Sequence, residues 1–245
     1  MTELRVPKAS DVLADHLRQR ILGGEMSPGE MLPAERLLAE QSRLSRTSVR
    51  EALRILEIEG LVSTKPGRNG GTIVRRPDAD AVAHSFDVFI RGRRVRFRAV
   101  LEAREQIEPI CAELAAGRRT DEELASLEAA TVAVEEAREN VPDFLSANVD
   151  WHLEIARASG NELLAAFMLA IGQAVRAATD IQDFNSDAVR TAALKAHRRV
   201  LKAIAAQDPA AARLAMHRHV HAYREQVQAV GVPEELELDE EDGTR

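Results

Sequence analysis

Apolar positions in the first sixty residues recur at helical spacing. Leucine or isoleucine returns every four residues from position 13 to 21, which gives one apolar stripe to a helix over 10–22 that Ser10 can cap. A second, shorter helix is expected over 34–41. A third is expected over 45–59, because Ser45 can cap it and apolar residues recur within it at i, i+3, i+4 and i+7.

Two short runs after the third helix, over 61–64 and 72–75, are typical of strands. The segment between them contains Asn69-Gly70, a pair that supplies the positive φ angles of a hairpin turn. Three helices followed by a basic hairpin form the arrangement of a winged helix-turn-helix.

The rest of the chain shows helical patterning and no convincing strand alternation. Pro77 and its polar neighbours break the pattern, so we expect domains over 1–76 and 77–231. Helices are expected over about 79–92, 94–117, 121–139, 141–159, 161–184, 187–206 and 209–230. The predicted fold class is mainly α: an N-terminal winged helix-turn-helix with a small β-hairpin wing, followed by an all-α helical bundle.

Charge is divided unevenly along the 245 residues, whose formal net charge is −7. Residues 1–76 carry 13 basic and 10 acidic side chains, a net +3, whereas the remainder carries 20 and 30, a net −10. Much of the acidic excess lies in 232–245, which we expect to be a disordered acidic tail. The basic balance of the first part is compatible with nucleic acid.

Several classes of protein are excluded by what the sequence lacks. Cys111 is the only cysteine, which excludes an internal disulfide and a cysteine-based zinc site. No apolar run approaches the roughly 18 residues of a spanning helix, and the first residues do not resemble a signal peptide. We therefore expect a cytoplasmic protein without a membrane partner. No phosphate loop, GxSxG or HExxH motif indicates an enzyme.

The predicted third helix contains groups that can bind DNA. Its free backbone N–H groups can meet a phosphate at its start. Arg46 and Arg50 lie one turn apart and can point together at base edges or at the backbone. In the predicted wing, Lys65 and Arg68 are basic, and Gly67 allows the backbone to approach a groove closely.

Two stretches of this part, PGEMLPAER over 28–36 and SRTSVREAL over 45–53, resemble the motifs of the GntR family of bacterial transcriptional regulators. The resemblance implies that Arg36 contacts the DNA backbone, and that Arg46 and Arg50 contact bases and phosphates. It also implies backbone contacts from the hydroxyls of Ser45, Thr47 and Ser48. The wing tip at Gly67, with its neighbours Lys65 and Arg68, would enter the minor groove.

The histidines of the second part lie at positions that could form a metal site. His152, His197 and a group of three near the C-terminus fall on three different predicted helices, so one from each helix could converge on a metal. In that last group His217 and His221 lie four residues apart and share a face, whereas His219 points elsewhere. The spacing alone leaves open which of them turns inward.

Three segments, over 104–109, 152–161 and 196–204, resemble the FCD ligand-binding domain of the FadR subfamily. Many FCD domains hold a metal through Asp-x-x-x-His and two further histidines. By position the resemblance implies four ligands for a divalent transition metal such as Zn, Ni or Mn: Asn148, His152, His197 and His219. It thus leaves His217 and His221 on the surface.

One ligand departs from the family pattern, because Asn148 stands where metal-binding members carry aspartate. Its amide oxygen can coordinate a metal but brings no charge, which would weaken the site. Asp150 lies roughly on the opposite helix face and cannot simply replace it. The alternative is a metal-free polar pocket whose side chains, Asn148 included, hydrogen-bond an effector directly.

Arg104 is the other candidate for binding an effector. By resemblance it projects inward and can grip a carboxylate with two hydrogen bonds. The alternative is an ion pair with Glu108, four residues later on the same helix. Trp151, the only tryptophan, is expected to pack in the core.

These observations and resemblances predict a dimeric transcription regulator, by default a repressor, that binds a palindromic operator in double-stranded DNA. A small carboxylate metabolite in the helical domain would control its DNA affinity, through a metal or through Arg104. One alternative is a DNA-binding protein that responds to no effector. Another, a metal-dependent hydrolase with a DNA-binding appendage, lacks a well-placed general base.

Overall fold

The computed structural model describes residues 7–65, 70–77, 79–179 and 186–230. It divides into two compact units, Met1–Ala81 and Val82–Arg245. Some predictions lie outside the described residues: the hairpin turn, the wing residues Gly67 and Arg68, the end of the helix expected over 161–184, and the tail over 232–245.

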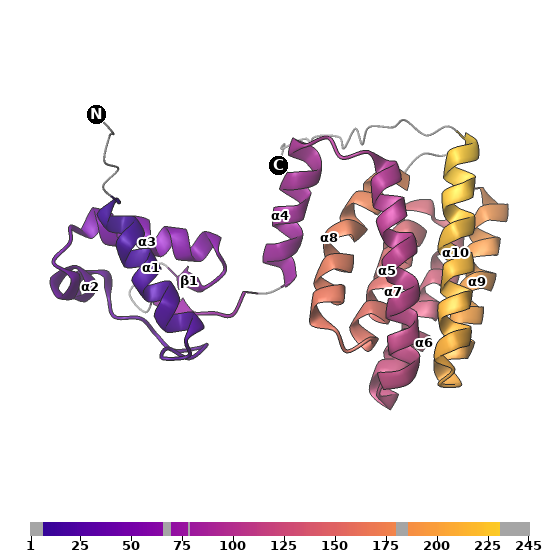
Figure 1. Ribbon diagram of the computed structural model, residues 1–245, viewed down its shortest axis with the longest axis horizontal. Helices are drawn as coiled ribbons and strands as arrows, with labels where there is room; N and C mark the ends of the chain where they lie inside the picture. The colour runs from indigo at the N-terminus through magenta and orange to yellow at the C-terminus, as the bar shows by residue number, and fades with distance from the viewer. Residues whose placement is uncertain (1–6, 66–69, 78, 180–185, 231–245) are drawn as a thin grey trace. The chain divides into compact units, whose positions relative to one another are not determined.

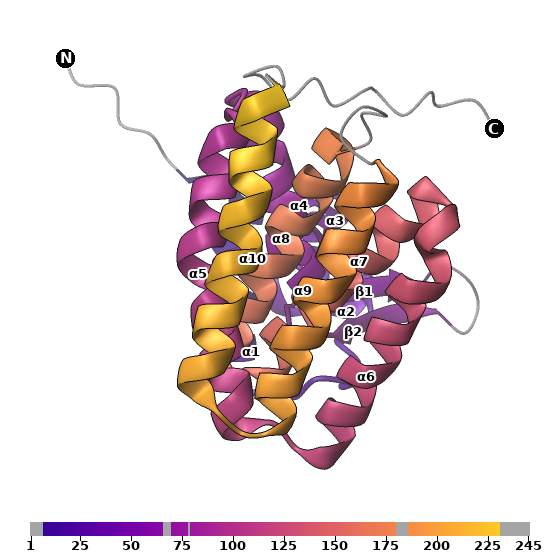
Figure 2. The same cartoon turned by 90° about the vertical axis from the view of Figure 1, so that its right-hand side faces the viewer.

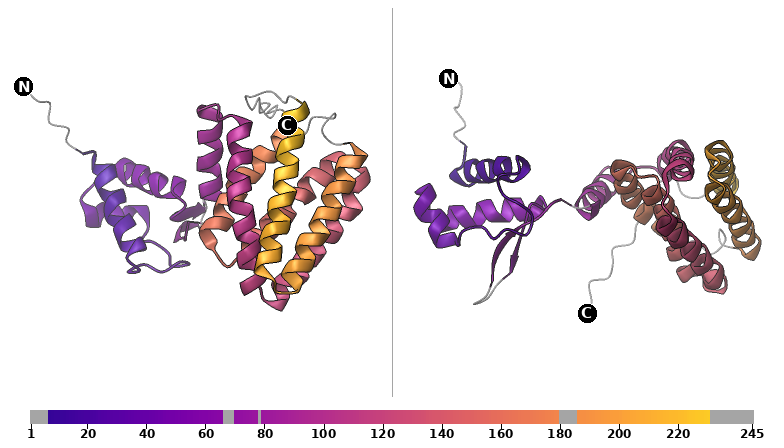
Figure 3. Two further views of the ribbon diagram at one scale, coloured as in Figure 1. Left: turned by 45° about the vertical axis from the view of Figure 1, so that its right-hand side comes forward. Right: turned by 90° about the horizontal axis from the view of Figure 1, so that it is seen from below.

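The first unit contains three helices and an antiparallel hairpin (Figures 1 and 3). Its elements are α1 (Ala9–Leu22), α2 (Glu35–Ser42), α3 (Arg46–Ile58), β1 (Val62–Lys65) and β2 (Gly71–Val74). Helix α3 packs against both α1 and α2, and the register of the hairpin pairs Val62 with Val74. Leu17, Val49 and Leu56 are among the most deeply buried side chains of this unit. The predicted winged helix-turn-helix class is confirmed.

The two predicted serine caps have different outcomes. Ser45 caps α3, because its hydroxyl accepts a hydrogen bond from the backbone N–H of Ser48 at 3.1 Å. The prediction for Ser10 is wrong: Lys8 occupies the N-cap of α1, and Ser10 lies inside the helix. Ser10 shares the face of Leu13 and Leu17, so its side chain is buried with theirs instead of turning back to the helix end.

The second unit is helical throughout its described residues. Its elements are α4 (Ala79–Gly92), which begins at the end of the first unit, α5 (Phe97–Arg118), α6 (Asp121–Glu136), the short 3-10 helix η1 (Ala137–Glu139), α7 (Val141–Ala158), α8 (Glu162–Thr179), α9 (Asp187–Ala205) and α10 (Pro209–Val230). The all-α class predicted for this part is confirmed. Thr120 starts α6 with a reciprocal cap, in which its side chain and that of Glu123 bond each other's backbone N–H.

The helices of the second unit form a bundle in which α7 is central (Figures 1 and 2). Helix α7 packs on α5, α6 and α8, while α10 lies along α5 and beside α9. Trp151 of α7 is fully buried, as expected of a core residue, and its indole N–H donates to the hydroxyl of Thr131 at 2.9 Å. Within the described residues, no helix has the length and apolarity needed to cross a bilayer.

Candidate functional site

The first unit presents an exposed basic surface at the start of α3. Arg46, Thr47 and Arg50 are exposed, and Ser48 is half-buried beside the capping hydroxyl of Ser45, 2.9 Å away. Ser45 stabilises the first turn of α3 by accepting a hydrogen bond from one backbone donor, so the side chains that follow it project from a well-formed helix. The predicted contact residues of this helix therefore reach solvent from one end of a well-formed helix.

Ion pairs hold two of the predicted DNA-contacting arginines in place. The guanidinium of Arg50 lies 3.0 Å from a carboxylate oxygen of Glu35, which links the start of α2 to α3 and raises the pKa of Arg50. Arg36 pairs with Glu40 at 2.8 Å within α2. Both arginines keep most of their side-chain surface exposed, 72% for Arg50 and 69% for Arg36, so both remain accessible to a phosphate. Lys65 is exposed at the end of β1.

The second unit brings three histidines from three helices into one cluster. His152 comes from α7, His197 from α9 and His219 from α10. The Nε2 atom of His219 lies 3.2 Å from that of His197 and 3.3 Å from that of His152. Metal–nitrogen bonds of 2.0–2.1 Å in a tetrahedral site separate their nitrogens by about 3.4 Å. The spacing of the three Nε2 atoms therefore suits a shared metal ion.

The buried carboxylate of Glu108 contacts His152 and orients its ring within the cluster. Glu108 of α5 has 2% of its side chain exposed, forms an ion pair with the guanidinium of Arg104, and holds its other carboxylate oxygen against Nδ1 of His152. A carboxylate on one ring nitrogen directs the other nitrogen toward a metal and fixes the tautomer. The second nitrogen of His152, Nε2, faces His219 and also lies 3.3 Å from Nη2 of Arg104.

Burial sets the protonation of these groups. It lowers the pKa of His152 and of His197, and it lowers the pKa of His219 to about 3. Burial alone would raise the pKa of Glu108, but the positive charge of Arg104, the interaction with His152 and the hydrogen bonds to both together outweigh it and hold that pKa well below its usual range. At neutral pH the imidazoles are therefore neutral, the form that binds metal, beside an ionised carboxylate.

Asn148 lies beside the cluster, one turn before His152 on α7. It lines a cavity of about 40 Å³ together with Arg104, His152, His219 and Tyr223. This volume holds a few water molecules but not an organic acid. Asp150, in contrast, is exposed on the far side of α7, in agreement with the helical spacing.

Arg104 combines features of both alternatives considered for it. It projects into the bundle with 5% of the residue exposed, yet its guanidinium is already paired with Glu108. Its central carbon also lies 5.5 Å from the ring centre of Tyr223. The Nε–H of Arg104 is thus committed to Glu108, and its Nη2 faces His152.

The remaining two C-terminal histidines face outward. His217 and His221 keep 52% and 45% of their side chains exposed. The Nδ1 atom of His221 lies 2.7 Å from a carboxylate oxygen of Glu105 on α5. Of the three alternatives that spacing left open on α10, the structure thus places His219 in the cluster.

Sequence reasoning treated Glu108 only as a partner for Arg104 and missed its contact with His152. A signal was present, because Leu101, Arg104, Glu108, Ala112 and Ala115 recur at helical spacing and form one face of α5. All five are buried. Two opposite charges among core positions indicate a buried polar network.

Comparisons with known proteins support both units. Residues 9–74 match the family model "Bacterial regulatory proteins, gntR family", and residues 99–222 match the FCD domain. The chain is 29% identical to the HTH-type transcriptional regulator LutR of Bacillus subtilis, over 82% of this chain and 92% of the relative. It is 30% identical to the Exu regulon transcriptional regulator of Escherichia coli, over 85% and 80%.

A solved structure shows the same architecture. Streptococcus agalactiae GntR superposes with a TM-score of 0.63 at 28% sequence identity, covering 88% of this chain and 99% of that protein. The similarity therefore extends over both units.

Proposed function

The chain belongs to the gntR family of bacterial regulatory proteins, and from this premise we propose that a small carboxylate bound in its FCD domain controls its affinity for DNA. It is a DNA-binding transcriptional regulator and not an enzyme. The observation that carries the proposal is the convergence of three neutral imidazoles backed by a buried carboxylate. Burying polar groups costs stability, so we take this buried cluster in a regulator to be a site where a ligand binds.

In this proposal the ligands of a divalent transition metal are the Nε2 atoms of His152, His197 and His219, with Asn148 beside them. A metal bound there supplies open coordination positions that attract a carboxylate. Glu108 holds the His152 ring in place, and burial keeps the imidazoles unprotonated. The identity of the metal, whether Zn, Ni or Mn, is a matter for measurement.

In the first unit we propose that DNA is contacted by the start of α3 and by the hairpin. Arg46 and Arg50 would contact bases and phosphates, and Arg36 would contact the backbone. The exposed surface of Arg50 and Arg36 supports these roles. Two chains would bind the halves of a palindromic operator as a homodimer in the cytoplasm, and effector binding would release the repressor from DNA.

Metal content tests the site directly. Untagged protein purified without chelators is expected to contain about one transition metal per chain by elemental mass spectrometry. His152→Gln and His197→Gln should lose it, whereas His217→Gln, a change on the exposed face of α10, should retain it. A metal-free wild-type protein that still binds DNA would contradict the metal and favour the polar pocket.

Regulation is tested with a duplex selected from a random library. Fluorescence anisotropy should show tight binding by the wild type and by His152→Ala, because His152 lies in the second unit. Carboxylates from a panel of hydroxy and keto acids should weaken DNA binding by the wild type but not by His152→Ala. If no acid changes the DNA affinity of the wild type, the protein acts without an effector.

A further inference from the structure

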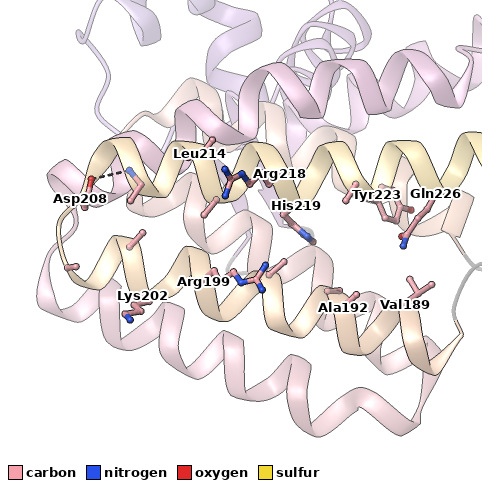
Figure 4. Close-up of a pocket in the computed structure, with 17 residues that line it drawn as sticks. Val189, Ala192, Arg199, Lys202, Asp208, Leu214, Arg218, His219, Tyr223 and Gln226 are labelled. Atoms are coloured by element: carbon pink, nitrogen blue, oxygen red, sulfur yellow. Dashed lines mark hydrogen bonds between the residues drawn. The ribbon is translucent and has the colours of Figure 1, made fainter.

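A long groove of about 850 Å³ runs between α9 and α10 (Figure 4). It extends from Asp208, where α10 begins, to Val189 and Gln226 at the opposite end. Its walls are largely alanine, including Ala192, Ala196, Ala203, Ala211, Ala215 and Ala222. Small side chains on both helices leave an apolar channel that is some twenty times larger than the cavity of about 40 Å³ beside Asn148.

Three basic side chains line this apolar groove. Arg199 and Lys202 come from α9, and Arg218 comes from α10 on the opposite wall (Figure 4). None of the three forms an ion pair with another described residue. The one acidic residue in the lining, Asp208, caps α10 by accepting from the N–H of Ala211 at 3.0 Å.

Basic residues on the flanks of the same helices that face α6 and α5 are paired instead. Arg198 of α9 pairs with Glu135 at 2.6 Å, and Arg213 of α10 pairs with Glu113 at 2.7 Å. Arg199, Lys202 and Arg218 thus place three positive charges without an ion pair to another described residue along the groove, within a unit whose overall charge is negative. Unpaired guanidinium groups beside an apolar surface favour a ligand that is anionic at one point and apolar elsewhere.

The floor of the groove includes His219 and Tyr223. His219 lines the groove and also contacts His152 and His197, so one member of the histidine cluster borders the groove. The cavity inside the bundle is too small for an organic acid, and Arg104 is already paired with Glu108. The space and the free positive charge that an effector needs are both found in the groove.

We propose that the α9–α10 groove binds an amphipathic carboxylate, with its carboxylate on Arg199 and Arg218 and its elongated apolar body along the alanine walls. The inference rests on the proposed function, since it names the class of the effector and the place where its body lies. Arg199 and Arg218 then replace Arg104 as the residues that recognise the carboxylate.

Isothermal titration of the full chain with decanoate tests the assignment. The double variant Arg199→Ala/Arg218→Ala is expected to raise the Kd by about tenfold or more, the loss of two charge-assisted contacts. The matched control Arg198→Ala/Arg213→Ala removes the same number of arginines from the flanks of the same helices that face α6 and α5, and its Kd should stay within about twofold. Ala196→Leu, which fills the groove and keeps every charge, should also weaken binding.

Circular dichroism must show that each variant is folded. No saturable decanoate binding by the wild type, or an equal loss in both double variants, would overturn the proposal. A chain that ends at residue 230 is tested in the same way. If it binds decanoate and the full chain does not, the acidic segment 231–245 occupies the groove, and the proposal is overturned. So would a change of sedimentation coefficient in the Arg199→Ala/Arg218→Ala variant, because it would make the groove an interface between copies.

The DNA anisotropy assay separates this proposal from the function on which it rests. If decanoate binds through Arg199 and Arg218, and neither decanoate nor any acid of the panel changes DNA affinity, the groove stands and control by a carboxylate fails. If the Arg199→Ala/Arg218→Ala variant responds to carboxylates as fully as the wild type, control by a carboxylate stands and the groove is overturned.

Discussion

Two opposite charges lie in the apolar interior of the helical unit at Arg104 and Glu108. Burying an ion pair costs desolvation that attraction barely repays, so such a pair is poorly explained by stability alone. Here the same carboxylate touches His152 and orients its ring. The pair is therefore best understood as support for the histidine cluster.

Replacing Glu108 by Gln should destabilise the protein by about 3 kcal/mol, because Arg104 stays buried without a counter-charge. Urea unfolding followed by Trp151 fluorescence measures this loss. Metal affinity should fall by about 10- to 100-fold, since the His152 ring loses its support.

Glu113→Gln is the matched control, on the same helix but in an exposed pair with Arg213. It should cost less than about 1 kcal/mol and leave metal affinity unchanged. If the two changes had equal effects on stability and on metal affinity, Glu108 would have no special role in supporting His152.

At the scale of elements, α3 depends on its first turn. Ser45 caps the helix, and the backbone donors and arginines that follow face outward together. Glu35 of α2 holds the guanidinium of Arg50 in the free protein. In the proposed complex with DNA, this contact would be given up or shared.

Arg50→Ala is expected to weaken operator binding by about 1–3 kcal/mol, if Arg50 reaches a base edge. Anisotropy with the selected duplex measures the change. Arg20→Ala, which removes an exposed arginine of α1 paired with Glu25, is the control and should have little effect. An Arg50→Ala variant with wild-type affinity would remove Arg50 from the proposed contact surface.

At the scale of the whole molecule, the two units differ in charge and in architecture. The basic first part suits DNA, and the acidic remainder contains the histidine cluster. Trp151 is the only tryptophan and stacks on His197 with ring centres 3.7 Å apart. Its fluorescence therefore reports on the helical unit alone.

Removing a bound metal with a chelator should lower the urea midpoint seen by Trp151, because a ligand that binds only the folded state stabilises it. Far-UV circular dichroism, which reports on both units, should show a second component whose midpoint does not move. His152→Gln/His197→Gln should make the Trp151 midpoint insensitive to the chelator. An unchanged midpoint in protein shown to contain metal would place the ion elsewhere.

The positions of the helices follow from local pattern and can be predicted from the order of residues alone. Apolar spacing and caps such as Ser45 and Thr120 act between residues within one or two turns, so they can be read along the chain. Ser10 shows the limit of that reading, because its burial against other helices overrode its capping preference.

Which side chains meet depends on how the helices pack in three dimensions. Spacing could not choose among the three histidines of α10, and the contact of Glu108 with His152 joins residues on different helices. The groove likewise depends on how far α9 and α10 stand apart. Such contacts arise from packing between distant segments, whereas helical periodicity states only which face of a helix is apolar.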